Sequence, residues 1–426
     1  MTAREPDGPE PTAEPPDASE RGTAREALSV PEFRRLYVGS TLSNTGRWMQ
    51  TAALGVLGWK ISESSAYLGA IIFAQLGPLG ILSLIGGSLA DTADRRLLLL
   101  WTQAWQMVWT FVLAFLLIDG NIGQGMLLLI VFVIGLGQGL YAPALTSVIP
   151  SIAGERNLSA AIALNSMQIN GTRVVGPALG GFLVSIWGFA EVFAINGISY
   201  LFVVSAIYLT RIPPGTALAR TFRERVFGGF TIAWRAPQVG RPIGLMFLFA
   251  FLCLPFIGQL PAIAEVNLGI DSESTTYGWF YACFGLGGLC GAFLVGTVFL
   301  RTPATRIVAV ALVGFAVSIA WLAVLEDINF AYIAIFLVGT FYFALPTALS
   351  TAWQEHVSSD VRGRVSALWV LAFGGTVPIA NVLAGQLVEL TSLRAVLMFG
   401  AVSAIALTAL RLPSGPVVGE EILDGP

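Results

Sequence analysis

Hydrophobic residues along this chain come in long runs that short polar clusters interrupt. Two of these runs, residues 97–118 and 331–353, contain no charged residue at all. A helix of about 20 apolar residues crosses the hydrocarbon core of a bilayer, whereas a buried helix in a soluble domain needs an apolar stripe on one face only. The pattern therefore predicts an all-α membrane protein.

Twelve such runs can be placed. We predict transmembrane helices over residues 36–59, 67–89, 97–118, 126–149, 158–186, 189–210, 242–264, 277–299, 307–325, 330–351, 365–389 and 393–411. The basic residues test this count, because cytoplasmic loops are enriched in Lys and Arg. With the N-terminus inside, the basic residues of the loops fall on the cytoplasmic side except Lys60 and Arg394. The alternation predicts twelve helices with both termini cytoplasmic.

The longest loop between spans, residues 211–241, divides the helices into two sixes that echo each other. Pro143 and Pro346 lie near the ends of the fourth and tenth spans, and a Ser-Ala pair opens both the fifth and the eleventh. Such a pseudo-repeated bundle is typical of alternating-access carriers. The RTFRERVFGGF segment of the loop predicts a short amphipathic helix on the inner leaflet. The predicted parts are a disordered cytoplasmic tail (1–35), an N-terminal half (36–210), a cytoplasmic linker (211–241), a C-terminal half (242–411) and a second tail (412–426).

Composition narrows the function classes. Only 12% of the residues are charged, against about a quarter in a soluble domain. The formal charge of -3 is uninformative about nucleic acid, but the sequence has no basic block, so we expect no nucleic-acid partner. The three cysteines fall in predicted spans and read as packing residues, and the only histidine, His356, reads as a surface residue. Without a metal cluster, nucleophile triad or P-loop, we expect neither an enzyme nor a cofactor.

The loop between the second and third spans reads GGSLADTADRRLLLL and holds a dense charge cluster. It is either a solvated turn or a latch, in which Asp91 caps a helix of the other half while Arg95 and Arg96 pair with acids. The loop resembles a signature of the major facilitator superfamily, from which Thr92 and Asp94 depart. The matching residues are Gly87, Leu89, Ala90, Asp91, Arg95 and Arg96. This variant is similar to that of the bacterial exporters that include the enterobactin exporter and macrolide efflux proteins.

The fifth span ends in RVVGPALGGFLV, which resembles the antiporter motif of the same superfamily. Gly176, Pro177, Gly180 and Gly181 match the motif, while Thr172 replaces its leading glycine. Small residues let helices approach closely and proline permits a kink, so ordinary helix packing is the alternative explanation. The resemblance covers residues 30–411. It implies that the loop signature, with Gly87 and Asp91, stabilises an outward-open state, and that the kink belongs to an antiporter.

Two spans carry polar stripes, each with an arginine that no mid-span carboxylate can neutralise. Polar faces of membrane helices turn toward a bundle interior or a wet cavity, and the planar fork of arginine can hold a carboxylate through two bonds. The predicted substrate-binding residues are Asn44, Arg47 and Gln50 of the first span and Asn165, Gln168 and Arg173 of the fifth. The alternative is that both guanidinium groups bond backbone carbonyls or neighbouring amides and only fix the packing.

The corresponding C-terminal helices are aromatic instead. The asymmetry suggests an aromatic wall from the seventh and eighth spans, and the alternative is that these residues serve packing or the interfacial aromatic belt. The aromatic residues are Phe247, Phe249, Phe251, Phe256, Tyr277, Trp279 and Tyr281, with Gln259 as a lone polar residue. Glutamates occur only near the outer ends of the spans, and of these Glu191 is the candidate for proton coupling.

These observations predict a secondary transporter of the bacterial cytoplasmic membrane. It exports an amphipathic, anionic small molecule, a siderophore-like metabolite or a drug, as a monomer and by proton antiport. Two alternatives remain open at this point: an uptake carrier for an organic anion, and a non-transporting scaffold or receptor that uses the same fold.

Overall fold

A computed structural model gives the structure of the protein. It describes residues 22–92, 94–119, 122–154, 156–213, 222–299, 301–358, 361–419 and 421. The side chains of residues 81, 83–92, 143, 147 and 222–227 lie outside this description. Within it the chain is helical, apart from turns, extended segments and one isolated bridge between Val357 and Val418.

The N-terminal half begins earlier than the hydrophobic pattern indicates. Its helices are α1 (Ala24–Ser29), α2 (Pro31–Ser62), α3 (Ser65–Thr92), α4 (Arg95–Leu117), α5 (Gln124–Ala153), α6 (Leu158–Trp187) and α7 (Phe189–Leu209). Residues 24–35, expected in a disordered tail, are thus helical, whereas residues 1–21 lie outside the described part. The cause is local: Thr23 and Glu26 form a capping box at α1, and Glu26 forms an ion pair with Arg156 at 3.0 Å.

The C-terminal half contains more breaks. Its elements are α8 (Phe222–Arg235), α9 (Pro237–Leu252), η2 (Leu254–Ile257), α10 (Leu260–Ala262), η3 (Ile263–Asn267), α11 (Thr275–Phe293), η4 (Leu294–Val298), α12 (Ala304–Val324), α13 (Ile328–Gln354), α14 (Arg362–Val370), η5 (Leu371–Gly375), α15 (Thr376–Leu390) and α16 (Leu393–Leu407). The predicted single span over residues 242–264 is broken after Leu252, where Pro255 and Pro261 remove backbone donors. Helix α8 falls on the predicted amphipathic segment.

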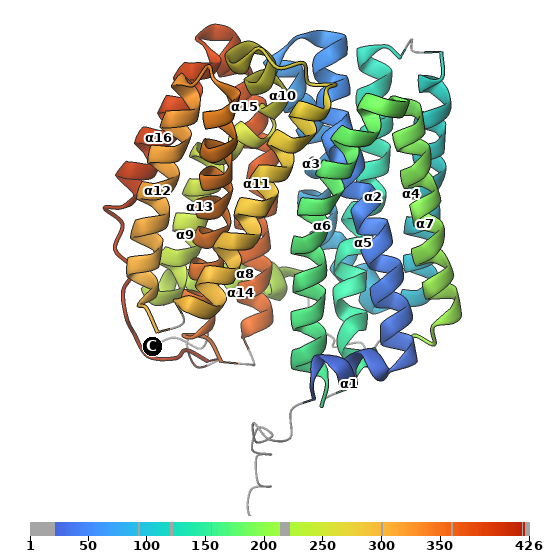
Figure 1. The fold of residues 1–426 in the computed structure, drawn as a ribbon. Coiled ribbons are helices and arrows are strands. Elements are labelled where there is room, and N and C mark those ends of the chain that lie inside the picture. Colours follow the sequence, from blue (N-terminus) through green and yellow to red (C-terminus); the bar gives the residue numbers. More distant parts are fainter. Residues whose placement is uncertain are drawn as a thin grey trace, which may run out of the picture.

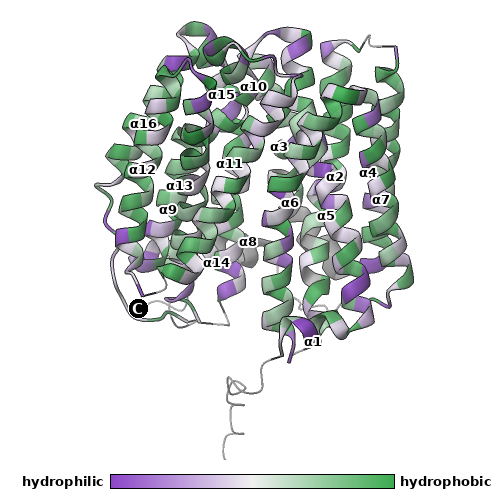
Figure 2. Cartoon of the chain, viewed as in Figure 1, coloured by the Kyte–Doolittle hydropathy of each residue, from purple (hydrophilic) through white to green (hydrophobic). Residues whose placement is uncertain are grey.

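Seven helices or helical runs of the described chain are long and apolar enough to cross a membrane: α4, α5, α7, α11 with η4, α12, α13, and α14 through α15. Figure 2 shows apolar residues over most of the bundle, with hydrophilic residues gathered at its two ends and interrupting α2 and α6. Large apolar side chains such as Trp101 and Phe115 point outward. Outward apolar side chains on such helices identify a multi-pass membrane protein.

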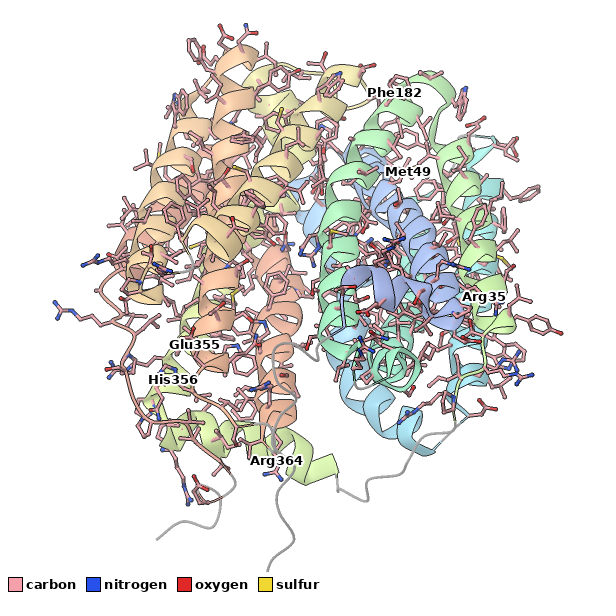
Figure 3. All side chains as sticks on the ribbon, turned by 60° about the horizontal axis from the view of Figure 1, so that its bottom comes forward. Arg35, Met49, Phe182, Glu355, His356 and Arg364 are labelled. Carbon is pink, nitrogen blue, oxygen red and sulfur yellow. The ribbon has the colours of Figure 1, made fainter. Side chains whose placement is uncertain are left out.

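The two halves stand side by side, with α2–α7 on one side and α9–α16 on the other (Figure 1). Between them α3 packs against α15, and α6 packs against α11. We call the end that holds α1, α8 and α14 the inner end, because the arginine pattern assigns it to the cytoplasm, and the opposite end the outer end. Figure 3 looks toward the inner end, where Arg35 lies on one half and Glu355, His356 and Arg364 lie on the other.

Candidate functional site

Arg47 lies midway along α2 and is half-buried. Its guanidinium donates to Asn44 Oδ1 at 2.6 Å, one turn earlier on the same helix. Tyr141 of α5 and Tyr200 of α7 lie close enough to interact with its charge. Among the described residues no carboxylate forms an ion pair with it. This guanidinium therefore hydrogen-bonds to an amide of its own helix, with two tyrosines of the same half nearby.

Arg173 lies on α6 and connects the two halves. Its guanidinium carbon is 5.2 Å from the ring centre of Trp48 on α2 and 5.7 Å from that of Phe343 on α13. Tyr281 and Tyr342, also of the C-terminal half, lie within reach of its charge. Cations are held over aromatic faces by about 0.5–2 kcal/mol, which only partly offsets the loss of hydration. Arg173 thus lies beside aromatic residues of both halves, of which only Tyr281 belongs to the predicted aromatic wall.

Two buried N–H donors around Arg173 lack a hydrogen-bond acceptor among the described residues. In the described part of the chain, Arg173 Nε and Trp48 Nε1 are buried without a hydrogen-bond partner. Arg47 and Arg173 are also close enough for their like charges to act on each other. A buried donor without a partner costs about 1–3 kcal/mol, and like charges add to that cost. Both costs fall when an anion with acceptor oxygens lies between the two arginines.

The other predicted binding residues separate into two groups. Asn44 lies beside Arg47 through their hydrogen bond, and Gln168 is buried with its amide nitrogen unpartnered among the described residues. Gln50 instead turns into the N-terminal half, where its side-chain oxygen accepts from Asn196 and, at 3.4 Å, from Thr110. Its position at the edge of the polar stripe places it on the face that packs against α4 and α7. Asn165 is half-buried on α6, and its binding role stays a prediction.

The aromatic wall has a composition other than the expected one. Phe249 and Phe256 pack in the C-terminal core against Phe315, at ring-centre distances of 5.1 and 5.7 Å. Phe247 and Phe251 stack on each other on the outside of that half. Of the remaining members, Tyr281 lies within reach of the charge of Arg173.

Three aromatic residues of the site escaped sequence reasoning. They are Trp48, Tyr342 and Phe343. The sequence did contain a signal for two of them: the tenth span corresponds to the fourth in the repeat, and it carries the run FYF three residues before Pro346.

The glycines of the antiporter-like segment allow α6 to pack closely against both α2 and α11. A Cβ at Gly176 would lie 2.5 Å from Trp48 Cβ, and one at Gly180 would lie 2.7 Å from the carbonyl oxygen of Met49. A Cβ at Gly181 would overlap the backbone of Gly278 on α11, in the other half. Pro177 lies inside the helix between these contacts. The close approach to α2 positions Arg173 over Trp48, and Gly181 ties the same helix to the C-terminal half.

The predicted latch is only partly described. Asp94 caps α4 by accepting from the backbone N–H groups of Arg96 at 2.9 Å and Leu97 at 3.2 Å. Arg96 donates to the carbonyl of Tyr208 and lies over that ring, 5.4 Å from its centre. Its pairing with an acid stays a prediction, because the side chain of Asp91 lies outside the description. The last carbonyls of a helix lack intrahelical partners, so an arginine satisfies them at the end of α7.

Arg35 does the same for α7 at Leu209, through a bond of 3.1 Å (Figure 3). Arg95 begins α4 directly after the cap. Gly87 and Asp91 lie in the last turns of α3, where side chains are outside the description. Their latch role stays a prediction.

Polar contacts join the halves at the outer end, and we call these residues the outer gate. Trp59 Nε1 donates to Glu265 at 2.7 Å, Lys60 pairs with Glu273 at 2.8 Å, and Ser64 donates to Glu389 at 2.9 Å. Ser272 donates to the same Glu265 through its backbone N–H and its hydroxyl. The structure is thus an outer-closed state. Glu191, in the first turn of α7, is exposed and takes no part in these bonds.

Comparisons with known proteins agree with this architecture. The chain is 21% identical over 360 residues to the staphyloferrin A transporter of Staphylococcus aureus, covering 82% of this chain and 87% of that one. It is 21% identical to the enterobactin exporter EntS of Shigella boydii, covering 80% and 81%. It is 24% identical to the uncharacterized MFS-type transporter YfiS of Bacillus subtilis, of which it spans 63%.

Solved transporter structures share the fold. A bacterial homologue of the lysosomal transporter Spinster, in an inward-facing conformation, superimposes with a TM-score of 0.66 at 18% identity, over 91% of this chain and 95% of that one. The nucleoside transporter NupG gives a TM-score of 0.71 at 12% identity, over 89% and 98%. A family model described as transmembrane secretion effector matches residues 23–418. The chain therefore belongs to the transmembrane secretion effectors of the major facilitator superfamily.

Proposed function

We propose that this protein exports an amphipathic, anionic small molecule by alternating access and proton antiport. In this proposal twelve helices span the bacterial cytoplasmic membrane with both termini in the cytoplasm, and a single chain transports. The substrate binds between the halves at mid-depth. Its negative charge lies against Arg47 and Arg173, and its apolar part lies against the aromatic residues of α11 and α13.

One observation carries this proposal: two neighbouring guanidinium groups that no described carboxylate neutralises. A lone structural arginine in a membrane helix finds carbonyls or an acid. Arg173 instead faces aromatic rings and keeps its Nε without an acceptor in the described part of the chain. A bound carboxylate or catecholate would supply both the charge and the oxygens.

The relatives support the substrate class. Those with assigned substrates are named for staphyloferrin A transport and for enterobactin export, and both compounds are siderophores. At about one residue in five identical, they favour a siderophore-like metabolite without naming one. Uptake of an organic anion remains the second candidate, because the same arginine pair would serve it. A scaffold is disfavoured, since the relatives with assigned functions are transporters.

For the proton, two glutamates differ in surroundings. Glu191, the predicted residue, is exposed at the outer end. Glu265 is half-buried and accepts a bond from Trp59 of the opposite half, so its protonation would weaken the gate. We expect Glu265→Gln to uncouple substrate accumulation from the pH gradient in everted vesicles, and Glu191→Gln to do so only if the proton binds there. Accumulation that survives an uncoupler would rule out proton antiport.

The binding site is tested with one substrate in two forms, a free carboxylate and its methyl ester. Arg47→Gln and Arg173→Gln should each weaken binding of the charged form by about 10- to 100-fold, since hydrogen bonds to charged groups contribute about 1.5–3 kcal/mol. Binding of the ester should change little. Arg→Lys variants should fall between, because a lysine keeps the charge and loses the planar fork.

Arg301→Gln is the matched control, because Arg301 is exposed at the inner end. It should leave both affinities unchanged. Equal losses for the charged and the esterified form would show that the arginines only fix helix packing, and the anion site would be abandoned. Right-side-out and everted vesicles, assayed with the same substrate, separate export from uptake.

A further inference from the structure

A groove with a volume of about 1190 Å³ opens on the C-terminal half near its inner end. Its walls come from α8, α9, the η5–α15 region and the residues just after α16. None of the lining residues belongs to the N-terminal half. The groove therefore lies outside the path between the halves, and the proposed transport site does not use it.

Apart from two arginines, the lining is predominantly apolar and faces outward. It includes the large apolar side chains of Phe230, Trp234, Phe247, Phe251, Ile379 and Leu410. Trp234 is 88% exposed and Phe247 is 45% exposed, although both are large hydrophobic residues. Exposed aromatic side chains at the inner end of a membrane bundle lie at the depth of the acyl chains and the interface. Acyl chains are the apolar material available at this place.

Two arginines stand at the mouth of the groove. Arg241 begins the apolar part of α9 and donates to the backbone carbonyl of Arg411 at 3.2 Å, which holds the two residues together. Both side chains are exposed, and neither forms an ion pair with a described carboxylate. A pair of free cations next to an apolar groove is complementary to a phosphate that carries acyl chains.

The groove has a structural cause. In the N-terminal half, α6 packs closely on α2 through Gly176 and Gly180. The corresponding segment of the C-terminal half contains the π-helical turn η5, and α9 ends at Leu252. Gly244 on α9 has open space where a side chain would project. A π-turn displaces the helix that follows, so α9 and α15 do not close on each other here.

We propose that this groove binds one anionic phospholipid of the inner leaflet. The phosphate lies between Arg241 and Arg411, and the acyl chains run along Phe247 and Phe251 toward the bilayer centre. Helix α8, with Phe230 and Trp234, covers the interfacial side. Lipid binding here is separate from substrate binding, because the groove shares no residue with the arginine pair of α2 and α6.

Native mass spectrometry of the full chain in detergent tests this, with phosphatidylglycerol and phosphatidylcholine titrated separately. We expect one phosphatidylglycerol to bind more tightly than phosphatidylcholine. The double variant Arg241→Gln/Arg411→Gln should lose about 30-fold in affinity for phosphatidylglycerol, since each arginine near an anionic surface contributes a factor of about five. Gly244→Leu should weaken both lipids by filling the groove without a clash.

Matched controls are available in the same leaflet. Arg301→Gln/Arg306→Gln removes two exposed charges from another inner loop, and Gly296→Leu adds a side chain into open space on η4. Both should bind phosphatidylglycerol as the wild type does. Equal affinity for the two lipids in the wild type, or the same loss in the control pair, would overturn the proposal. So would full displacement of the lipid by inorganic phosphate alone, because the acyl chains would then contribute nothing.

Discussion

Gly181→Ala should open the outer end of the protein. Gly181 lies near the outer end of α6 and faces Gly278 on α11, across the boundary between the halves. A methyl group at Gly181 would come closer than 3.0 Å to the backbone of Gly278, whereas ordinary contact begins at 3.4 Å. The two helices must therefore separate by at least about 0.4 Å, or the outer-closed state must become less populated.

The size of the effect follows from this overlap. Neither neighbour is a flexible side chain: the methyl group meets backbone atoms of a buried glycine, which cannot turn aside. Overpacking of this kind costs about 1–3 kcal/mol. In an outer-open state α6 and α11 separate at this point, so the cost falls on the outer-closed state alone. The ratio of outer-open to outer-closed molecules should rise by about 5- to 150-fold.

Spin labels at Gly125 and Glu326, on outer turns of the two halves, report this ratio. Both positions are exposed and outside the outer gate. A cysteine-free background is needed, which means replacing Cys253, Cys283 and Cys290. Pulsed electron resonance should show a longer distance gaining population in Gly181→Ala.

Gly171→Ala is the control, because it lies on the same helix with nothing within 4 Å of the added methyl group. It should leave the distance distribution as it is in the wild type, while its helix gains slightly in stability. If Gly181→Ala matches Gly171→Ala in both distance and transport rate, the glycine contact does not hold the outer end closed.

Three further outcomes are expected. Trp59→Phe removes the donor to Glu265 and should raise the outer-open population about tenfold or more, measured with the same labels; Trp59→Tyr variants that restore a bond should recover it. Asp94→Ala should lower the apparent melting temperature, since an N-cap contributes about 1 kcal/mol, while Asp94→Asn should not. The pKa of Glu26 lies below its ordinary value of 4.5, because of the bond from the backbone of Thr23, then its hydroxyl, then the charge of Arg156. The attachment of α1 is therefore complete above that ordinary pKa and is lost as the pH falls through the lowered one. A spin label at Ser29 should gain mobility only in that range, and Glu26→Gln should be mobile at every pH.

Much of the fold could be read from hydrophobicity and charge. Helices occupy the predicted segments because a long apolar run has few other ways to satisfy its backbone in a membrane. Where the structure differs from the prediction, local features of the chain are the cause. The helical start at Ala24 depends on a capping box, and the break after Leu252 depends on two prolines that hydropathy averages do not see.

The sequence predicted the arginines of the candidate site in the N-terminal half, but not its aromatic residues on α13 of the C-terminal half. Arg47 and Arg173 stand out in the sequence, because a charge in an apolar span is costly wherever it points. Phe343 does not stand out, since aromatic residues occur throughout the spans and only the packing of α13 against α11 brings this ring close to Arg173. Gln50 shows the reverse case: a polar residue beside the stripe serves the contact between α2 and α7 through Asn196.

The positions of these residues on the two halves determine which contacts can drive a change between the outer-closed and outer-open states. Arg47 and Arg173 both belong to the N-terminal half, so relief of their repulsion by an anion is similar in the outer-closed and outer-open states. A ligand shifts an equilibrium only through contacts that differ between the states. Those contacts run from Arg173 to Phe343, across the halves. Trp59 of the outer gate lies on α2 about 18 Å above Arg47, at 1.5 Å per residue along one continuous helix. In the proposed transport cycle, a substrate that draws the two halves together at mid-depth would act on the gate through α2 and α6 as rigid helices. We therefore expect affinity and coupling to depend on different residues of the proposed site.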